Sequence, residues 1–543
     1  MKRILVVLMT TIAFTQIQAQ SNLRDELIDL ESKGQIQKGV TVADQMLGNA
    51  LKENNHTDYI FAAIYKLKFL PRVYELESNN IHDSLKLIIQ QAPEKAKAAL
   101  KLMEAISLSS QYRANKWSID QKPDDGVENI LFDEMSKHDY FRLVSAAIDE
   151  ALKLAQKEED KITSYKELFD GDDYYLKYFP KLIDQIFFQG IELLSEYDGN
   201  SYEFDSEQIS NIQNCESTSM PLKKSLEMFG QWHKANASNL EILGFIELNR
   251  LEWINKRNNH ISRFELYEAA LKNLLEKYKG NEICADMQLA LAQHYKMLSQ
   301  QYNPTDTATV KYYGTLQQAW DISNEIEKKY PDTHAAKLAK NLKYDIELKG
   351  LSISTEQYQI ADKNMAVSLS YSNLSKVKIT IKEADVIEVF AYSYNINTKN
   401  SKVVYEEWFD LPKTDDYYKH TTTLVIPFGK LGSYSIEAST DNEIDEIATT
   451  FFHVTKMAMF TESKDENNTN VWLVDANNGK AVSNAKIEIL KYEYGRDRNR
   501  GRQNVKILDS YTIKNGSVSV PTKTLSGAWV IRAINGNDTL LQN

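Results

Sequence analysis

Cysteine is scarce in this chain of 543 residues, which contains only Cys215 and Cys284. A framework of disulfides is therefore excluded as the source of stability. Whether the two cysteines form one bridge or stay as two buried free thiols is open, because a sequence does not show whether they meet. No Cys-x-x-Cys pair is present and no histidine lies at ligand spacing from either cysteine, so neither is expected to bind a metal.

Positive charge and long apolar runs are also in short supply. The 64 Lys and Arg residues are outnumbered by 76 Asp and Glu residues, which gives a formal net charge of -12. Phosphate binding needs a positive field, so a nucleic-acid partner is not expected. Beyond residue 14 no apolar run approaches the ~20 residues that a membrane-spanning helix needs, so no transmembrane segment is expected in the mature chain.

Motifs of catalysis are absent too. The nine histidines include no HExxH motif and no pair four residues apart, so a zinc protease is not predicted. The chain has no GxSxG, P-loop or GxGxxG motif. The sequence therefore predicts neither the nucleophile turn of α/β-hydrolases nor the common glycine-rich phosphate-binding loops. We therefore predict that the chain is not an enzyme and has no catalytic residues, metal or cofactor.

The first residues have the pattern of an export signal. Lys2 and Arg3 precede an apolar stretch over residues 4–14, and Ala19 is the small residue that signal peptidase prefers. Cleavage is expected after Ala19, so residues 1–19 are excluded from the fold. The chain is predicted to be exported to the periplasm or cell envelope, with secretion as an alternative.

Residues 20–350 carry the apolar spacing of helices. Two segments, 267–278 and 317–330, both end in Lys-Tyr, and each is followed by a second helical pattern that contains small residues. Small residues let antiparallel helices pack closely, which is typical of tetratricopeptide-like arrays. The repeat is longer than the ~34 residues of a regular unit. A divergent all-helical array is therefore predicted for 20–350.

The apolar period changes to two after Gly350. Val367, Leu369 and Tyr371 alternate with polar residues, and later runs do the same. Gly and Asn residues separate the runs, as expected for turns that need positive φ. Strands with no helix between them predict antiparallel β-sandwiches, and the length allows two. The predicted sandwiches are 351–460 and 461–543, with the junction in 456–470.

One basic loop is the candidate partner-binding site. Its arginines are Arg496, Arg498, Arg500 and Arg502. Such a loop can dock an acidic partner or lipopolysaccharide phosphate, although a run of charges is more often a solvated hairpin tip.

Two further segments have both a functional and a structural interpretation. The acidic run 170–173 offers carboxylates to Ca²⁺, but it lacks the spaced ligands and closing Glu of an EF-hand loop, which favours a helix-capping turn. Aromatic residues in 174–179 and at 187–188 could stack on sugars, but their helical spacing favours packing in a core.

Short motifs in both halves carry a family resemblance. The helical half contains YRANKW at 112–117, YFPKLID at 178–184 and LNRLEW at 248–253. The strand half contains LSYSNLSKV at 369–377, PFGKLGSY at 427–434, VWLVD at 471–475 and NGKAV at 478–482. In this order they resemble the helices, and then the strand turns, of the amino-terminal region of large alpha-2-macroglobulin-like proteins of Bacteroidetes. Ala481 stands where that family usually has proline.

The resemblance implies a helical domain that leads into two macroglobulin-like, Ig-like sandwiches. In that family the chain continues through further sandwiches, a protease-cleaved bait segment and, in many members, a Cys-Gly-Glu-Gln thioester. Here Glu216 follows Cys215 and Ala285 follows Cys284, so no thioester is present. The chain looks like the front portion of a larger protein, or a natural truncation.

The function that the resemblance implies is that of a non-enzymatic envelope protein of an alpha-2-macroglobulin-like endopeptidase-inhibitor system. It would act by protein binding and scaffolding, with a protease among its candidate partners and its oligomeric state left open. One alternative is an envelope adaptor whose helical array binds a partner protein or peptide. The other is a carbohydrate-binding protein, which only the aromatic residues suggest.

Overall fold

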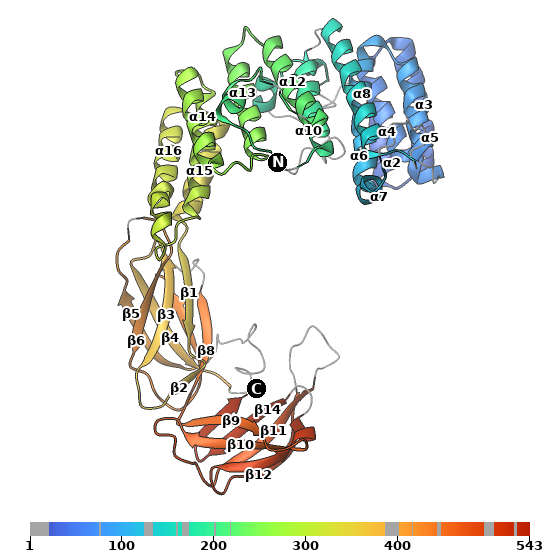
Figure 1. Cartoon of the computed structure of the whole chain (residues 1–543). Helices are drawn as coiled ribbons and strands as arrows, with labels where there is room; N and C mark the ends of the chain where they lie inside the picture. The colour runs from blue at the N-terminus through green and yellow to red at the C-terminus, as the bar shows by residue number, and fades with distance from the viewer. Residues whose placement is uncertain are drawn as a thin grey trace. The chain divides into compact units, whose positions relative to one another are not determined.

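The computed structural model describes most of the chain from residue 21 onward. The described residues are 21–74, 78–123, 134–158, 161–165, 173–199, 202–214, 216–217, 219–385, 401–414, 416–441, 447–493, 504–525 and 529–542. The chain divides into two compact units: unit 1 comprises Met1–His294 with Ile322–Ala339, and unit 2 comprises Tyr295–Asp321 with Lys340–Asn543. Helices occupy the first part of the sequence and strands the last (Figure 1), so the predicted order of a helical part and then β-sheets is confirmed.

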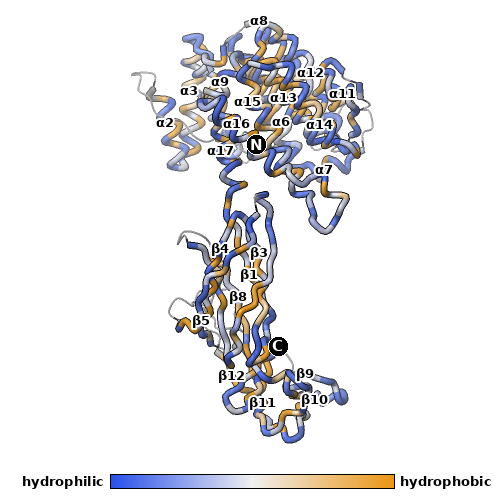
Figure 2. Tube along the Cα trace, turned by 90° about the vertical axis from the view of Figure 1, so that its left-hand side faces the viewer, coloured by the Kyte–Doolittle hydropathy of each residue, from blue (hydrophilic) through white to orange (hydrophobic). Residues whose placement is uncertain are grey.

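The helical part is built of helices that pack in chain order. Their bounds are α2 (Ser21–Ser32), α3 (Ile36–Glu53), α4 (His56–Tyr74), α5 (Ser78–Gln91), α6 (Glu94–Ala114), α7 (Lys116–Asp120), α8 (Lys137–Glu158), α9 (Asp173–Tyr178), α10 (Leu182–Leu194), α11 (Ser206–Ser210), α12 (Met220–Ala235), α13 (Leu240–Asn255), α14 (Arg263–Lys277), α15 (Cys284–Ser299), α16 (Thr315–Lys329) and α17 (His334–Glu347). From α2 to α14 each long helix contacts the next one. Hydrophobic and hydrophilic residues alternate along them (Figure 2), and none that the structure describes is long and apolar enough to cross a membrane.

The internal similarity predicted late in the helical part is confirmed as two successive helix pairs. The segments 267–278 and 317–330 lie in α14 and α16, and each is followed by a second helix, α15 or α17. The small residues that the sequence places in these second helices are buried, as expected where helices approach closely. They include Ala285, Ala292, Ala336 and Ala339.

Side-chain caps fix where two central helices begin. The Ser219 hydroxyl accepts a hydrogen bond from the Leu222 N–H (3.4 Å) at the start of α12. The Asn239 side-chain oxygen accepts from the Glu241 N–H (3.1 Å) and from the next N–H of α13. Serine and asparagine satisfy backbone donors that the first turn of a helix leaves unpaired, which explains why both helices begin at these residues.

Two glycines on α3 give a matched prediction about packing. A Cβ atom at Gly39 would lie 2.4 Å from the ring of Phe69, which is fully buried, whereas a Cβ atom at Gly48 would meet nothing within 4 Å. We expect Gly39→Ala to lower the free energy of unfolding by about 1–3 kcal/mol through overpacking. Gly48→Ala is expected to raise it by up to ~1 kcal/mol, because alanine favours a helix over glycine. Chemical denaturation of both variants tests this; equal effects would contradict it.

The first sandwich is formed by two facing sheets. Its strands are β1 (Gly350–Thr355), β2 (Tyr358–Ile360), β3 (Met365–Ser372), β4 (Lys376–Glu383), β5 (Val403–Asp410), β6 (His420–Ile426), β7 (Gly432–Ser439) and β8 (Ala448–Thr455). Among the described residues the sheet orders are β1-β3-β6 and β2-β8-β7-β4-β5. The strands pair antiparallel as predicted, with one exception, since β2 runs parallel to β8. Only Glu356 and Gln357 separate β1 from β2, so the chain changes sheets there without reversing direction.

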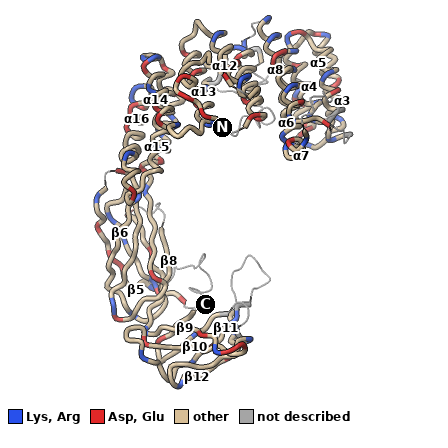
Figure 3. The backbone as a smooth tube through the Cα atoms, viewed as in Figure 1, with Lys and Arg blue, Asp and Glu red and all other residues tan. Residues whose placement is uncertain are grey.

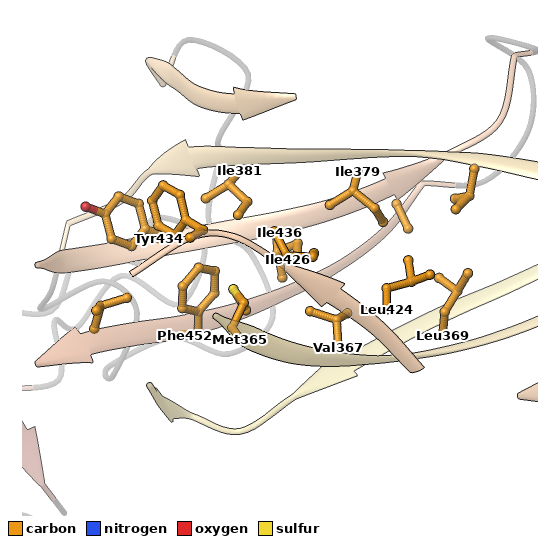
Figure 4. Close-up of a cluster of buried hydrophobic side chains, with 14 of the residues drawn as sticks. Met365, Val367, Leu369, Ile379, Ile381, Leu424, Ile426, Tyr434, Ile436 and Phe452 are labelled. Atoms are coloured by element: carbon orange, nitrogen blue, oxygen red, sulfur yellow. The ribbon is translucent and has the colours of Figure 1, made fainter. Parts of the chain in front are cut away.

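The core of the first sandwich lies between its two sheets. Val367 and Leu369 of β3 point from one sheet toward Ile379 of β4 and Ile436 of β7 in the other (Figure 4), and all four are fully buried. Phe452 of β8 belongs to the same core. Alternate residues of a strand face one side of its sheet, which explains why the period of two in the sequence produces this core.

The second sandwich follows the same plan. Its strands are β9 (Met457–Ser463), β10 (Asn468–Asp475), β11 (Lys486–Glu493), β12 (Asn504–Thr512), β13 (Ser517–Pro521), β14 (Trp529–Asn535) and β15 (Asp538–Gln542). The described residues form sheets of order β13-β10-β9 and β12-β11-β14-β15, which enclose a common core.

The junction between the sandwiches lies at the first residue of the predicted range 456–470. β9 begins at Met457 and pairs with β10, so a boundary between 460 and 461 would cut through this hairpin. The polar residues 464–467 form its turn, where the Asp465 carboxylate accepts from the Asn467 N–H (2.9 Å). Turns and linkers share this polar composition, which is why the sequence did not distinguish them. Lys456 alone separates β8 from β9.

Candidate functional site

A groove between α3, α4 and α5 is the candidate binding site of unit 1. Its volume is about 350 Å³. Leu47, Gly48 and Leu51 of α3 form one wall, and α5 contributes the other. The facing wall and the floor include Leu87 and Ile88 of α5 and Tyr59 and Lys66 of α4. Residues at spacings of three and four lie on one face of a helix, so each wall is a single stripe of its helix.

The groove combines exposed apolar walls with a fixed floor. Leu51 is 47% exposed and Leu87 is 57% exposed, although both are large aliphatic side chains. The Tyr59 hydroxyl donates to the Ile88 carbonyl oxygen (2.9 Å) and so ties α4 to α5. Lys66 pairs with Asp44 of α3 at 2.6 Å. The groove is therefore lined by exposed aliphatic side chains beside one ion pair.

A buried carboxylate joins the central helices of unit 1. Glu247 on α13 accepts hydrogen bonds from His233 Nε2 (2.7 Å), Lys277 Nζ (2.8 Å) and the Tyr278 hydroxyl (2.9 Å). Burial alone would raise the pKa of Glu247, but the bonds from His233 and Lys277 outweigh it and hold the pKa below its ordinary value of 4.5. The residue therefore links α12, α13 and α14 in its ionised form.

Glu247→Gln is expected to lower the free energy of unfolding of unit 1 by about 1–3 kcal/mol at pH 7, because charge-assisted hydrogen bonds are lost. A carboxyl group whose pKa is lowered by folding stabilises above its unfolded pKa, and that stabilisation disappears as the pH falls through the folded pKa. The difference between wild type and variant should therefore be complete at pH 7 and shrink below about pH 4.5. Thermal unfolding at several pH values measures it; a difference that is independent of pH would contradict the assignment.

A second set of contacts lies within unit 2, where helix ends meet the first sandwich. The ring of Tyr418 stacks on Tyr313 (5.8 Å between centroids) and contacts Tyr302 edge-on (5.1 Å). The Asn373 side-chain amide donates to the carbonyl oxygens of Ile346 and Leu348, both at 2.9 Å. These contacts attach the end of α17 and the loop before α16 to the sandwich, so the tyrosines serve as a structural joint.

The structure places few of the residues that the sequence singled out. Arg496, Arg498, Arg500 and Arg502 lie outside the described residues, as do Cys215 and residues 170–172. Cys284 is a buried free thiol whose Sγ donates to the Tyr278 carbonyl oxygen (3.0 Å), and burial raises its pKa. Among the described residues no group of three or more His, Cys, Asp and Glu side chains is placed to hold a metal ion.

The aromatic residues considered for sugar stacking serve mainly in packing. Tyr178, Phe179 and Phe187 are buried. The ring of Tyr178 stacks on Phe245 at 4.4 Å, and Phe179 contacts the buried ring of Trp232 at 5.9 Å. These rings therefore present no face to a sugar. Charged residues of both signs are interspersed along the described helices (Figure 3).

The described fold is a helical part followed by two sandwiches of mainly antiparallel strands, and the comparisons with known proteins give no family for it. No family model matches the sequence, and no curated protein matches it. A native alpha-2-macroglobulin fragment of Escherichia coli spanning domains MG0-NIE-MG1 is similar over 36% of this chain and 64% of its own, at 15% identity and a TM-score of 0.29. This chain thus spans less than two thirds of that fragment.

Two further solved structures show weaker similarity. Salmonella alpha-2-macroglobulin reacted with methylamine is 13% identical over 36% of this chain and 16% of its own, with a TM-score of 0.17. Pseudomonas fluorescens alkylpurine DNA glycosylase AlkC, bound to DNA containing an abasic-site analog, is 9% identical over 65% of this chain and 98% of its own, with a TM-score of 0.13. Scores this low assign neither a fold nor an activity to this chain.

Proposed function

We propose that this chain is a non-enzymatic binding and scaffolding protein of the cell envelope, built like the front part of an alpha-2-macroglobulin-like endopeptidase inhibitor. Its helices would form a tetratricopeptide-like array that binds a protein partner, and its sandwiches would be macroglobulin-like, Ig-like modules. The observation that carries the binding function is the groove between α3 and α5, with Leu51 and Leu87 exposed on facing walls. Large apolar side chains gathered around a hollow are typical of protein-binding surfaces.

The scaffolding function rests on how the modules of unit 2 are joined. Only Leu348 and Lys349 separate α17 from β1, and only Lys456 separates the two sandwiches. Connections this short leave little freedom between neighbouring modules, because a flexible linker needs several residues. Such connections would hold the modules of unit 2 in set positions relative to one another.

The residues that carry the family resemblance support the architecture through their structural roles. Asn373 has a φ of +56° in the turn between β3 and β4, and its side chain also holds the end of α17. Asp475 accepts from the Asn477 N–H (2.9 Å) in the turn that leads to Gly479, whose φ is +69°. These motifs shape turns and joints, so they support the proposed fold and leave the activity to be tested.

The groove is tested by recovery and titration of a partner. Full-length wild type, the groove variant Leu51→Glu with Leu87→Glu, and a control variant Met220→Glu with Leu240→Glu are used to recover proteins from an envelope extract. The control residues are 63% and 58% exposed and lie outside the groove. A protein that wild type recovers is then purified and titrated. We expect at least a tenfold loss of affinity for the groove variant only; equal affinity for all three chains would refute the groove as the binding site.

An adaptor would bind its partner in the same groove as an inhibitor would. The two functions differ in the effect of binding on the partner's activity. An inhibitor should slow cleavage of a protein substrate by the recovered partner, if that partner is a protease. An adaptor should leave the cleavage rate unchanged.

The proposed location is tested separately. Export predicts that the mature chain begins at Gln20 and that it is found in the envelope fraction of the cells.

A further inference from the structure

The joint between the two sandwiches of unit 2 is a compact set of hydrogen bonds. The backbone N–H of Lys456, the one residue between β8 and β9, donates to the Asp538 carboxylate (2.8 Å), and its side chain pairs with Asp362 (2.8 Å). The Asp538 side chain is buried on the second sandwich. The linker is therefore held from both sides.

Two side chains of the first sandwich reach the last strand of the second. His453 of β8 and Tyr358 of β2 are neighbours in the register of the parallel pair. His453 Nε2 bonds to the carbonyl oxygen of Thr539, and the Tyr358 hydroxyl donates to the carbonyl oxygen of Leu541. Alternate residues of a strand direct their carbonyls to the same edge, so both donors bind one edge of β15.

These contacts fix one of the ring protons of His453 in the closed joint. A carbonyl oxygen only accepts, so Nε2 carries a proton; Nδ1 lies 2.7 Å from the Ser433 hydroxyl, which can donate to a neutral ring or accept from a charged one. The ring is 2% exposed. The titratable or charged groups around it are Tyr358 on β2, Lys456 in the linker and Asp538 on β15. A neutral imidazole with its proton on Nε2 satisfies both contacts in the closed joint.

Burial makes a charged ring costly in this place. Burial lowers the pKa of His453, although the Thr539 carbonyl and the Asp538 carboxylate favour the charged form. If the sandwiches separate, the ring meets water and its pKa returns to its ordinary value of about 6.5. The open joint therefore binds a proton more tightly than the closed one.

We propose that this joint is an acid-released coupling, in which protonation of His453 separates the two sandwiches that the neutral ring holds together. The coupling is at full strength above pH 6.5 and weakens as the pH falls below that value. In that range the ratio of open to closed joints rises by at most about tenfold per pH unit, until the lowered pKa of the closed joint is reached.

The test measures the distance between the sandwiches in the full-length chain. Spin labels carried on unnatural amino acids at Val425 of β6 and Ile507 of β12, both exposed, leave the cysteines untouched. Double electron–electron resonance is recorded from pH 8 to pH 4.5 for wild type and for His453→Gln. Glutamine can donate to Thr539 and accept from Ser433 through its amide, but it does not titrate.

We expect one narrow distance distribution at pH 8 for both chains. Below pH 6 a second population should grow in wild type and stay absent in His453→Gln. Tyr358→Phe removes the other donor, so its second population should appear at a higher pH than that of wild type. No pH-dependent population in wild type, or the same one in His453→Gln, would overturn the proposal. Circular dichroism at each pH confirms that the sandwiches remain folded.

Discussion

Trp232→Ala is expected to lower the free energy of unfolding of unit 1 by about 3–5 kcal/mol, as for other fully buried aromatic residues. The ring is 0% exposed and lies among Phe179, Phe187 and Phe245, with centroid distances of 5.9–6.4 Å. Its removal leaves a cavity where helices α10, α12 and α13 meet, because the surrounding aromatic rings collapse only in part.

The same substitution leaves a buried carboxylate without one of its donors. Trp232 Nε1 donates to Asp184 (2.9 Å), which also accepts from the Asn236 amide (2.8 Å) and the Lys181 N–H (3.1 Å). Burial already raises the pKa of Asp184 despite these bonds. Loss of one donor should raise that pKa further, since fewer hydrogen bonds remain to stabilise the charge. The variant should therefore be most destabilised above the pKa of Asp184.

Trp117 provides the control for this prediction. It is also a tryptophan on a helix of unit 1, but it is 82% exposed. Trp117→Ala should change the free energy of unfolding by less than about 0.5 kcal/mol, as is usual for surface positions. Both variants are compared by urea denaturation followed by circular dichroism. Equal losses, or a loss below 1 kcal/mol for Trp232→Ala, would show that the aromatic cluster is not the core of unit 1.

The sequence predicted the classes of structure because hydrophobic period is a local property. The alternation of Val367, Leu369 and Tyr371 was enough to predict β3, and all three side chains are buried in the sandwich core. The repeated Lys-Tyr ends likewise identified α14 and α16. At the junction between the sandwiches, local composition was not enough to predict the boundary, because the polar residues after β9 fit a linker as well as a hairpin turn.

The candidate site could not be predicted in the same way. Leu47 and Leu51 form an apolar pair on α3, but nothing in the sequence says that Leu51 stays exposed on the wall of a groove. The joint is equally non-local, because His453 finds its partner Thr539 eighty-six residues later in the chain. One signal was present, since α3 has apolar residues on two adjacent stripes, which is more than one buried face requires. These stripes are Met46 with Ala50 and Leu47 with Leu51.

Several polar side chains of this chain connect one secondary-structure element to another. Glu247 links three helices, Asn373 holds the end of a helix against a sandwich, and Asp538 holds the linker between sandwiches. A buried polar group is costly unless it is hydrogen-bonded, so each such contact fixes the geometry of its joint. Fixed joints of this kind are what the proposed scaffolding function requires of the described modules.

Phe452→Ala should be as damaging to the first sandwich as Trp232→Ala is to unit 1. Phe452 is 0% exposed and lies between the rings of Tyr434 (5.5 Å) and Phe428 (6.1 Å). We expect a loss of about 3–5 kcal/mol in the free energy of unfolding of this sandwich, because the cavity would lie between two sheets that cannot collapse onto it.

Phe460 is the matched control, since it is also a phenylalanine in a strand but is 48% exposed on the second sandwich, with its ring stacked on Trp472 at 6.0 Å. Phe460→Ala should cost at most about 1 kcal/mol, the size of one cross-strand pair. Differential scanning calorimetry of the full-length chain measures both losses. Since His453 follows Phe452 directly in β8, Phe452→Ala should also weaken the joint to β15. The unfolding temperature of the second sandwich would then fall as well. An unchanged second transition would mean that the two sandwiches unfold independently.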